Sequence, residues 1–174
     1  MNRIVIYCSA SGSIERKYND AARDVVAGLC KKGFTIVSGG TILGTMGVVS
    51  DTVLQCGGHH RGVLPRFMEP LAHKGLTETV WTDTMARRKE EMRSGTVAAI
   101  ALPGGIGTLD ELIETLVLKK LGRYEGRVIV LNIDGFFNPL LALLDHYVET
   151  AMLARTDRAL IECFNSAKEL TDSF

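Results

Sequence analysis

Apolar runs alternate with amphipathic segments along the whole chain. The run Arg3–Tyr7 is rich in β-branched residues and gives way to small polar residues, as a buried strand does where it opens into a loop. The run Thr96–Leu102 is the most hydrophobic and stops at a proline. Strands that are apolar throughout are typical of a parallel sheet covered on both faces. By the same criteria we predict further strands at Phe34–Val37, Arg61–Leu64, Glu78–Trp81, Val128–Asn132 and Ala159–Ile161.

Segments with helical spacing separate these strands. Between Lys17 and Lys32 the apolar residues recur at intervals of three and four, and Gly33 stands where a helix commonly ends. Residues 66–77 show no periodicity. Such an alternation predicts an α/β protein, and we expect a single Rossmann-like doubly wound domain over residues 1–174, a mostly parallel sheet with helices on both faces. The other predicted helices are Met46–Gln55, a helix that begins at Asp83 or Thr84 and runs to Met92, Thr108–Leu121, Pro139–Thr150 and a final one from Ser166.

The charge balance narrows the classes of function. Lysine and arginine together number 20, as do aspartate and glutamate, so the formal net charge is zero. Broad binding of nucleic acid needs a basic excess, so we expect no nucleic-acid partner. Four scattered cysteines and four histidines without ligand spacing argue against a dedicated metal site, and we interpret His59, His60 and His73 as surface loop residues. No apolar run approaches the ~20 residues that cross a bilayer, and the opening run is too short for a signal peptide, so we expect a cytoplasmic protein without membrane contact.

Three predicted strands end in loops of small residues: CSASGS, SGGTILGTMG and PGGIGT. Glycine lets the backbone approach a ligand closely, and the N-terminus of a following helix attracts anions. None of the loops is a P-loop, because no GK[ST] follows the glycines, and none is a GxGxxG dinucleotide fingerprint. One loop of this kind could equally be a tight turn. Two of them on one small sheet favour a phosphorylated ligand, and a mononucleotide fits better than a dinucleotide.

Charged residues flank the loop PGGIGT on both sides. The stretch Thr108–Glu111 matches a capping box, in which the threonine and the glutamate satisfy backbone N–H groups at the start of a helix. From these residues alone we favour that structural role for Glu111, although a sugar bound at the loop would also lie beside it. The segment MARRKEEM holds three cations within one helical turn. Such a run is usually a solvated helix face, but it could also reach the crevice beside the loop.

PGGIGTLDE and MARRKEEM together resemble the LONELY GUY (LOG) family of cytokinin riboside 5′-monophosphate phosphoribohydrolases, whose members were long mislabelled as lysine decarboxylases. The family patterns PGGxGTxxE and M-x-x-R-K-x-x-M are both met in full. GLTE at Gly75–Glu78 and LNIDGFFNPLLALLDH at Leu131–His146 also resemble family segments, so the resemblance covers nearly the whole chain. It implies a homodimeric N-glycosyl hydrolase that cleaves adenosine 5′-monophosphate, plain or N6-substituted, without a metal or cofactor. The products would be the free base, a cytokinin or adenine, and ribose 5-phosphate.

By the same resemblance, Arg88 and Glu111 carry over as the catalytic pair. A guanidinium is a poor proton donor, so Arg88 would act electrostatically and orient the nucleotide. Glu111 would stabilise the cationic sugar carbon, or orient and deprotonate the attacking water. The loop amides and the Thr108 hydroxyl would take the 5′-phosphate. The nucleotide contacts would be Met85, Lys89, Gly104, Gly105, Ile106, Gly107 and Thr108, with Ser9, Gly39, Gly40, Gly44 and Thr45 from the two earlier loops.

The chain departs from the family pattern at positions that affect the specificity for the base more than the reaction itself. Thr41 and Thr45 replace a glycine and a leucine, and Ser9 replaces a glycine. For the family's substrate-binding glutamate, which falls within residues 65–75, only Glu69 is a candidate.

Three other functions stay open at this point. The fold could carry a phosphorylated nucleotide or cofactor without chemistry, as related molybdenum-cofactor binders do. An amino-acid decarboxylase would need a lysine for pyridoxal phosphate, and the lysines here stand in charged, surface-like contexts. A pure interaction domain would leave the glycine loops and the Arg88-Lys89 pair unexplained.

Overall fold

Seven parallel strands form one sheet in the order β4-β3-β2-β1-β5-β6-β7 in the computed structural model, which describes residues 2–174. Each neighbouring pair is parallel. The predicted α/β fold with a parallel sheet is therefore confirmed. The strands are β1 (Arg3–Tyr7), β2 (Thr35–Ser38), β3 (His60–Pro65), β4 (Glu78–Thr82), β5 (Thr96–Ala101), β6 (Arg127–Leu131) and β7 (Ile161–Phe164).

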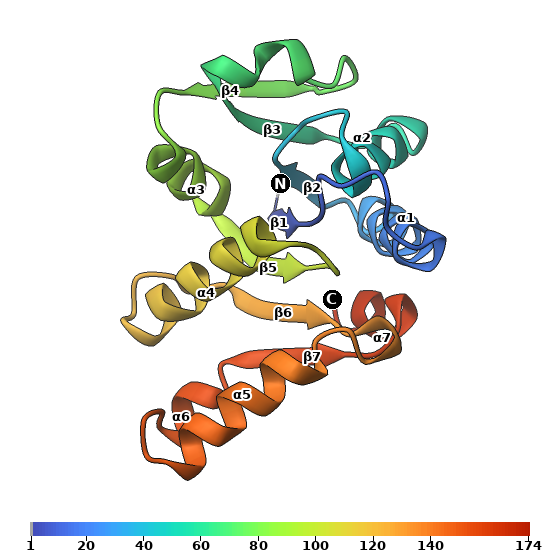
Figure 1. Cartoon of the computed structure of the whole chain (residues 1–174). Coiled ribbons are helices and arrows are strands. Elements are labelled where there is room, and N and C mark those ends of the chain that lie inside the picture. Colours follow the sequence, from blue (N-terminus) through green and yellow to red (C-terminus); the bar gives the residue numbers. More distant parts are fainter. Residues whose placement is uncertain (1) are drawn as a thin grey trace.

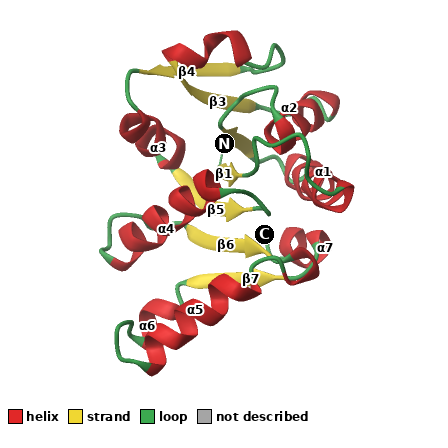
Figure 2. Cartoon of the chain, in the orientation of Figure 1, coloured by secondary structure: helices red, strands yellow, loops and turns green. Residues whose placement is uncertain are grey.

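Helices cover both faces of the sheet (Figures 1 and 2). One face carries α1 (Arg16–Lys31), α2 (Gly44–Gln55) and α7 (Ala167–Asp172). The other carries α3 (Met85–Arg93), α4 (Ile106–Lys120) and α5 (Asn138–Glu149), and the short α6 (Arg155–Arg158) follows α5. Two short 3-10 helices, Arg66–Leu71 and Ile133–Gly135, complete the chain. No helix of the described part is long and apolar enough to span a bilayer.

The side-chain alternation of β1 shows how the sheet builds two cores. Ile4 and Ile6 pack in the cluster beneath α1 and α2, whereas Val5 and Tyr7 pack in the cluster beneath α4. Because successive residues of a strand point to opposite faces, an apolar strand supplies both layers at once. Because both faces of the strands are buried, the strands appear in the sequence as uninterrupted apolar runs.

The strand order reverses beside β1. From β1 the chain proceeds outward through β2 and β3 to β4, then returns to β5 on the other side of β1 and continues outward to β7. The loops after β1 and β5 therefore leave the sheet in opposite directions and open a crevice at its carboxyl edge. Doubly wound proteins bind their ligands at such a switch point.

The structure differs from the sequence prediction in several places. α2 begins at Gly44, two residues before Met46, and a 3-10 helix occupies residues 66–71 of the aperiodic segment. The last strand is Ile161–Phe164 instead of Ala159–Ile161, because α6 and the turn after it occupy residues 155–160. The helix after the loop PGGIGT begins at Ile106, two residues before Thr108. His60 is no surface residue but the fully buried first residue of β3, with 0% of it exposed. The helix end at Gly33, by contrast, is confirmed by its left-handed backbone (φ 81°).

Candidate active site

A cavity of about 340 Å³ opens at the switch point. Its walls come from the loops after β1, β2 and β5 and from one side each of α3 and α4. Segments far apart in the sequence thus meet at one edge of the sheet. The lining residues are Ile6, Cys8, Ser9, Ala10, Ser11, Gly39, Met46, Met68, Met85, Arg88, Met92, Gly105, Gly107, Thr108 and Glu111.

Arg88 is held from three sides at the base of this cavity. Its Nε donates to the carbonyl oxygen of Val63 on β3 at 3.1 Å, and its Nη1 donates to Oε1 of Glu111 at 2.9 Å. Its Nη2 lies against the backbone of Gly39, where a Cβ would come within 2.5 Å of it. No acceptor for Nη2 is found within residues 2–174, so this nitrogen is left to meet a ligand. The charged segment MARRKEEM therefore presents one of its cations to the crevice and is more than a solvated face.

Glu111 is the partner of Arg88 on α4. The two side chains are only 9% and 11% exposed, so the ion pair is nearly enclosed. Burial raises the pKa of Glu111, and the neighbouring guanidinium opposes that rise. Oε2 of Glu111 has no hydrogen-bond partner in the described chain and is the oxygen available to the cavity. The site thus combines a fixed cation with a carboxylate that has a free oxygen.

The capping box predicted for Thr108 and Glu111 is wrong. Because α4 begins at Ile106, its N-cap is Gly105, which offers no side chain, and Thr108 already lies inside the helix. Glu111 is then one turn too far from the helix start to reach back to it, and binds Arg88 instead. Thr108 packs over Gly104, where a Cβ would lie 2.2 Å from the threonine Oγ1. Because Gly104 has no Cβ, Thr108 can pack directly against the loop, so the role of Gly104 is structural.

The first turn of α4 is open toward the cavity. Gly105 and Gly107 line it, and a Cβ on either would meet no atom within 4 Å. The first backbone N–H groups of a helix have no partner inside the helix, and no acidic residue stands in the first turn of α4. An anion can therefore approach this turn closely.

Some of the other predicted contacts line the cavity, and the rest lie outside its lining. Ser9, Gly39 and Met85 line the cavity. The rest of the predicted set lies outside its lining: Gly40 in the second loop, Gly44 and Thr45 in the first turn of α2, and Lys89, Gly104 and Ile106.

Two of these outlying residues join neighbouring elements. Lys89 reaches from α3 to Asp110 at 3.0 Å and also pairs with Glu114, and these carboxylates raise its pKa. Thr45 donates to Oδ1 of Asn19 at 3.0 Å and so ties α2 to α1. Lys89 thus joins α3 to α4, and Thr45 joins the first turn of α2 to α1.

Methionines form much of the apolar wall, and only Met85 among them was predicted as a ligand contact. Met46, Met68 and Met92 join Met85 around the cavity. Met46 stands in the glycine-rich stretch SGGTILGTMG, and Met92 in the segment MARRKEEM, so both had a usable sequence signal. Met68 lies in the aperiodic segment, where no sequence pattern indicated a ligand contact. Its neighbour Glu69, the candidate for the family's glutamate, is exposed and does not line the cavity.

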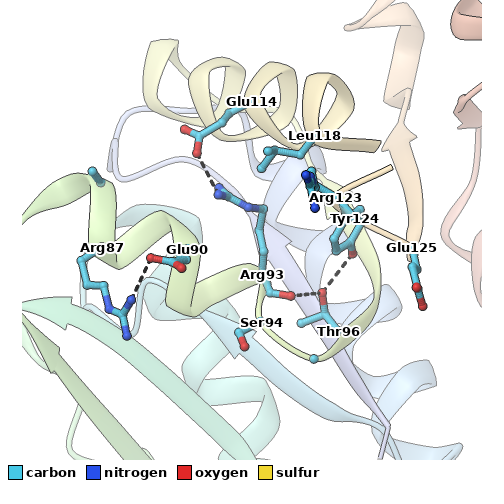
Figure 3. Close-up of a pocket in the computed structure, with 12 residues that line it drawn as sticks. Arg87, Glu90, Arg93, Ser94, Thr96, Glu114, Leu118, Arg123, Tyr124 and Glu125 are labelled. Carbon is cyan, nitrogen blue, oxygen red and sulfur yellow. Dashed lines mark hydrogen bonds and ion pairs between the residues drawn. The ribbon is translucent and has the colours of Figure 1, made fainter. Parts of the chain in front are cut away.

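A larger groove of about 750 Å³ lies between the same two helices, at the amino end of β5 (Figure 3). Arg93 donates from α3 to Glu114 of α4 at 2.8 Å, and Thr96 joins the carbonyl oxygen of Arg93 to the hydroxyl of Tyr124. The Arg93–Glu114 ion pair joins α3 to α4 at this end of the sheet. Residues 2–174 contain no cluster of three or more histidine, cysteine or carboxylate side chains that could hold a metal ion.

Comparison with known structures supports the fold. The molybdenum cofactor carrier protein of Chlamydomonas reinhardtii superposes with a TM-score of 0.78 at 17% identity, covering 99% of this chain and 94% of that one. The molybdenum cofactor binding protein of Rippkaea orientalis gives 0.75 at 20% identity, covering 99% and 97%. At these identities the likeness concerns the fold alone.

Comparison of sequences shows the family as well as the fold. The family model described as "Possible lysine decarboxylase" matches residues 46–174. Cytokinin riboside 5′-monophosphate phosphoribohydrolase LOG1 of Arabidopsis thaliana is 38% identical over 170 residues, which cover 97% of this chain and 80% of that protein. The probable phosphoribohydrolase LOGL2 of Oryza sativa subsp. japonica is 37% identical over 172 residues, covering 98% and 70%. The chain therefore belongs to the family of the cytokinin riboside 5′-monophosphate phosphoribohydrolases.

Proposed function

We propose that this protein hydrolyses the N-glycosidic bond of N6-substituted adenosine 5′-monophosphates. The observation that carries the proposal is the buried Arg88–Glu111 pair beside a cavity that ends at the start of α4. Water adds to the sugar carbon, the base leaves with a proton, and ribose 5-phosphate remains. The full-length similarity to phosphoribohydrolases supports the same reaction.

The open first turn of α4 orients the nucleotide. Its backbone N–H groups and the Thr108 hydroxyl bind the 5′-phosphate, because a helix N-terminus favours an anion. Glu111 stands one turn further along the same helix. A phosphate held at the loop therefore brings the ribose, which is joined directly to it, toward the carboxylate.

The charged pair acts on the sugar. Cleavage of a ribose–base bond passes through an oxocarbenium-like state, so a carboxylate beside the sugar carbon stabilises the transition state. The free Oε2 of Glu111 supplies that charge and orients the attacking water. Arg88 keeps Glu111 ionised and in place, and its free Nη2 binds the nucleotide.

The apolar part of the cavity favours a substituted base. Four methionines, Met46, Met68, Met85 and Met92, take part in its wall. Methionine side chains are flexible and polarizable, and they adapt to irregular apolar groups. An N6-prenyl group buries more apolar area here than the bare amino group of adenine, and each buried methylene contributes about 0.8 kcal/mol.

The substrate preference is tested by supplying AMP and N6-isopentenyl-AMP in parallel and following base release by chromatography. We expect the prenylated nucleotide to react with a kcat/KM at least ~10-fold higher, as burial of two or more methylenes predicts. Preference for AMP would contradict the assigned role of the methionines and indicate an AMP nucleosidase. Recovery of both nucleotides intact, together with a thermal shift on binding, would favour a carrier instead.

We also propose that two copies of the chain associate through α4. Its outer face carries a stripe of apolar residues at helical spacing, Ile106, Leu109, Ile113 and Val117, which line a groove of about 560 Å³. Ile106 is 88% exposed although it directly follows the cavity residue Gly105. A stripe of this kind beside the site is what a self-complementary helix–helix interface needs.

Replacement of Val117 by aspartate tests this interface. The charge would stand at the C-terminal end of the apolar stripe, within the groove, so we expect a dimer to become a monomer on size exclusion with light scattering. The matched control is Leu143→Asp, which introduces the same charge at a comparably exposed position on α5 (46% against 47% exposed). A wild-type monomer, or a dimer that survives Val117→Asp, would contradict the proposed interface.

The location that we propose is the cytoplasm. All four cysteines are free thiols, and two of them, Cys56 and Cys163, are exposed. Exposed thiols persist in reducing compartments, whereas secreted proteins tend to pair theirs.

A further inference from the structure

A buried polar pair joins β2 to β3 behind the cavity and takes no part in the chemistry proposed above. His60 on β3 and Ser38 at the end of β2 are both 0% exposed. Nε2 of His60 lies 2.8 Å from Oγ of Ser38. A histidine and a serine in an otherwise apolar sheet cost free energy unless their polar atoms are used.

The serine connects this pair to the second glycine loop. Oγ of Ser38 accepts the backbone N–H of Gly40 at 3.1 Å, which fixes the turn Gly39–Gly40 as the chain leaves the sheet. Gly40 has a left-handed backbone (φ 65°), and a Cβ there would lie 2.8 Å from Cα of Gly62, so the turn has little room to move inward. A hydrogen bond inside the sheet thus determines where the loop runs.

The glycine loop in turn touches Arg88. A Cβ on Gly39 would lie 2.5 Å from Nη2 of Arg88 and 2.6 Å from Sδ of Met46, so the backbone at Gly39 is in direct contact with both side chains. An outward shift of this turn would remove the contact between Gly39 and the guanidinium of Arg88. The chain of contacts therefore runs from His60 through Ser38 and the turn to Arg88.

His60 is a neutral ring that is bonded to Ser38 through Nε2. Burial lowers the pKa of His60 to about 4, which keeps the ring neutral at neutral pH. Nδ1 is buried and has no hydrogen-bond partner within residues 2–174, so Nε2 makes the hydrogen bond of the ring. In either tautomer Nε2 and Oγ of Ser38 share one hydrogen, and Oγ also accepts the N–H of Gly40.

We propose that His60 is a positioning residue for the hydrolytic reaction: through Ser38 and the turn Gly39–Gly40 it holds the Arg88 guanidinium against Glu111. The inference rests on the proposed function, because its effect on the rate needs the reaction to occur. It assigns a role to a histidine that lies outside the cavity and makes no contact with a substrate.

The test compares His60→Leu with His60→Gln, alone and in an Arg88→Met background. Leucine removes the hydrogen bond to Ser38, and we expect kcat to fall about tenfold while KM changes less than about threefold, as for loss of one buried hydrogen bond that acts on the transition state. Glutamine places an amide group near the position of Nε2 and should keep kcat within about threefold of wild type. In the Arg88→Met background the leucine substitution should have no further effect, because the group that it positions is gone.

If His60 contributed only to the stability of the fold, the cycle would give different results. The leucine variant would then lose the same factor with or without Arg88, or glutamine would do no better than leucine, and either result would overturn the proposal. If His60→Leu does not fold, Ser38→Ala takes its place in the same cycle, because it removes both hydrogen bonds with a small change of volume.

An independent measurement separates this proposal from the proposed function. The ¹⁵N chemical shift of Nε2 of His60 responds to the hydrogen bond with Ser38, and its measurement needs no substrate. A change of this shift in Ser38→Ala supports the chain of contacts even if the wild-type protein releases no base. An unchanged shift contradicts it even if the enzyme is fully active.

Discussion

Glu111→Gln is expected to lower kcat for base release at least ~100-fold, the usual size of an electrostatic or general-base contribution. The amide has the shape of the carboxylate, and its oxygen can still accept from Nη1 of Arg88, so the cavity should keep its form. What is lost is the negative charge beside the sugar carbon. Chromatography of the released base over a time course gives kcat, and circular dichroism checks the fold.

The matched control for this substitution is Glu114→Gln, on the same helix one turn later. Glu114 pairs with Lys89 and Arg93 and does not line the cavity. Partly exposed ion pairs contribute little, so we expect kcat to stay within about threefold of wild type. Equal losses in both variants would mean that the carboxylates of α4 act through stability alone.

Arg88→Met should also cost at least ~100-fold in kcat/KM, and it should change the pH profile as well. Methionine fills the space without charge or donors, so Glu111 loses the cation 2.9 Å from its Oε1. Since that cation opposes the rise caused by burial, the pKa of Glu111 must go up when it is removed. The reaction needs the carboxylate, so activity is lost as the pH falls through this pKa.

The sign of the change follows directly. In the variant the acid limb of kcat/KM should lie at a higher pH than in wild type. Arg87→Met is the control, since Arg87 is exposed and pairs only with Glu90 and Glu91 on its own helix. An acid limb that does not move in Arg88→Met would show that another group titrates there.

Much of the fold could be predicted because the strands of a doubly wound sheet carry a strong sequence signal. Strands such as β1 and β5 are buried on both faces, and small polar residues follow β1 while Gly95 and Pro103 flank β5. The errors fall where local rules compete with long-range contacts. A threonine three residues before a glutamate fits a capping box, but the helix begins earlier, and the buried Arg88 from a different helix takes the carboxylate.

The candidate site was predictable in its charged centre and less so in its walls. The two motifs bring Arg88 and Glu111 together at 2.9 Å although they are 23 positions apart. Met68 comes from an aperiodic segment that only the tertiary structure brings over the cavity. The burial of His60 could not be predicted from its neighbours in the sequence, because the hydroxyl that pairs with its ring lies 22 positions earlier, at Ser38.

The most direct test of the central claim is a stoichiometric assay of N6-isopentenyl-AMP with the wild-type protein and with Glu111→Gln. We predict that the wild-type protein releases free base and ribose 5-phosphate in equal amounts, and that the variant binds the nucleotide but releases at least ~100-fold less of each per unit time. Release at a near-native rate by the variant, or recovery of intact nucleotide from the wild-type protein, would contradict the account.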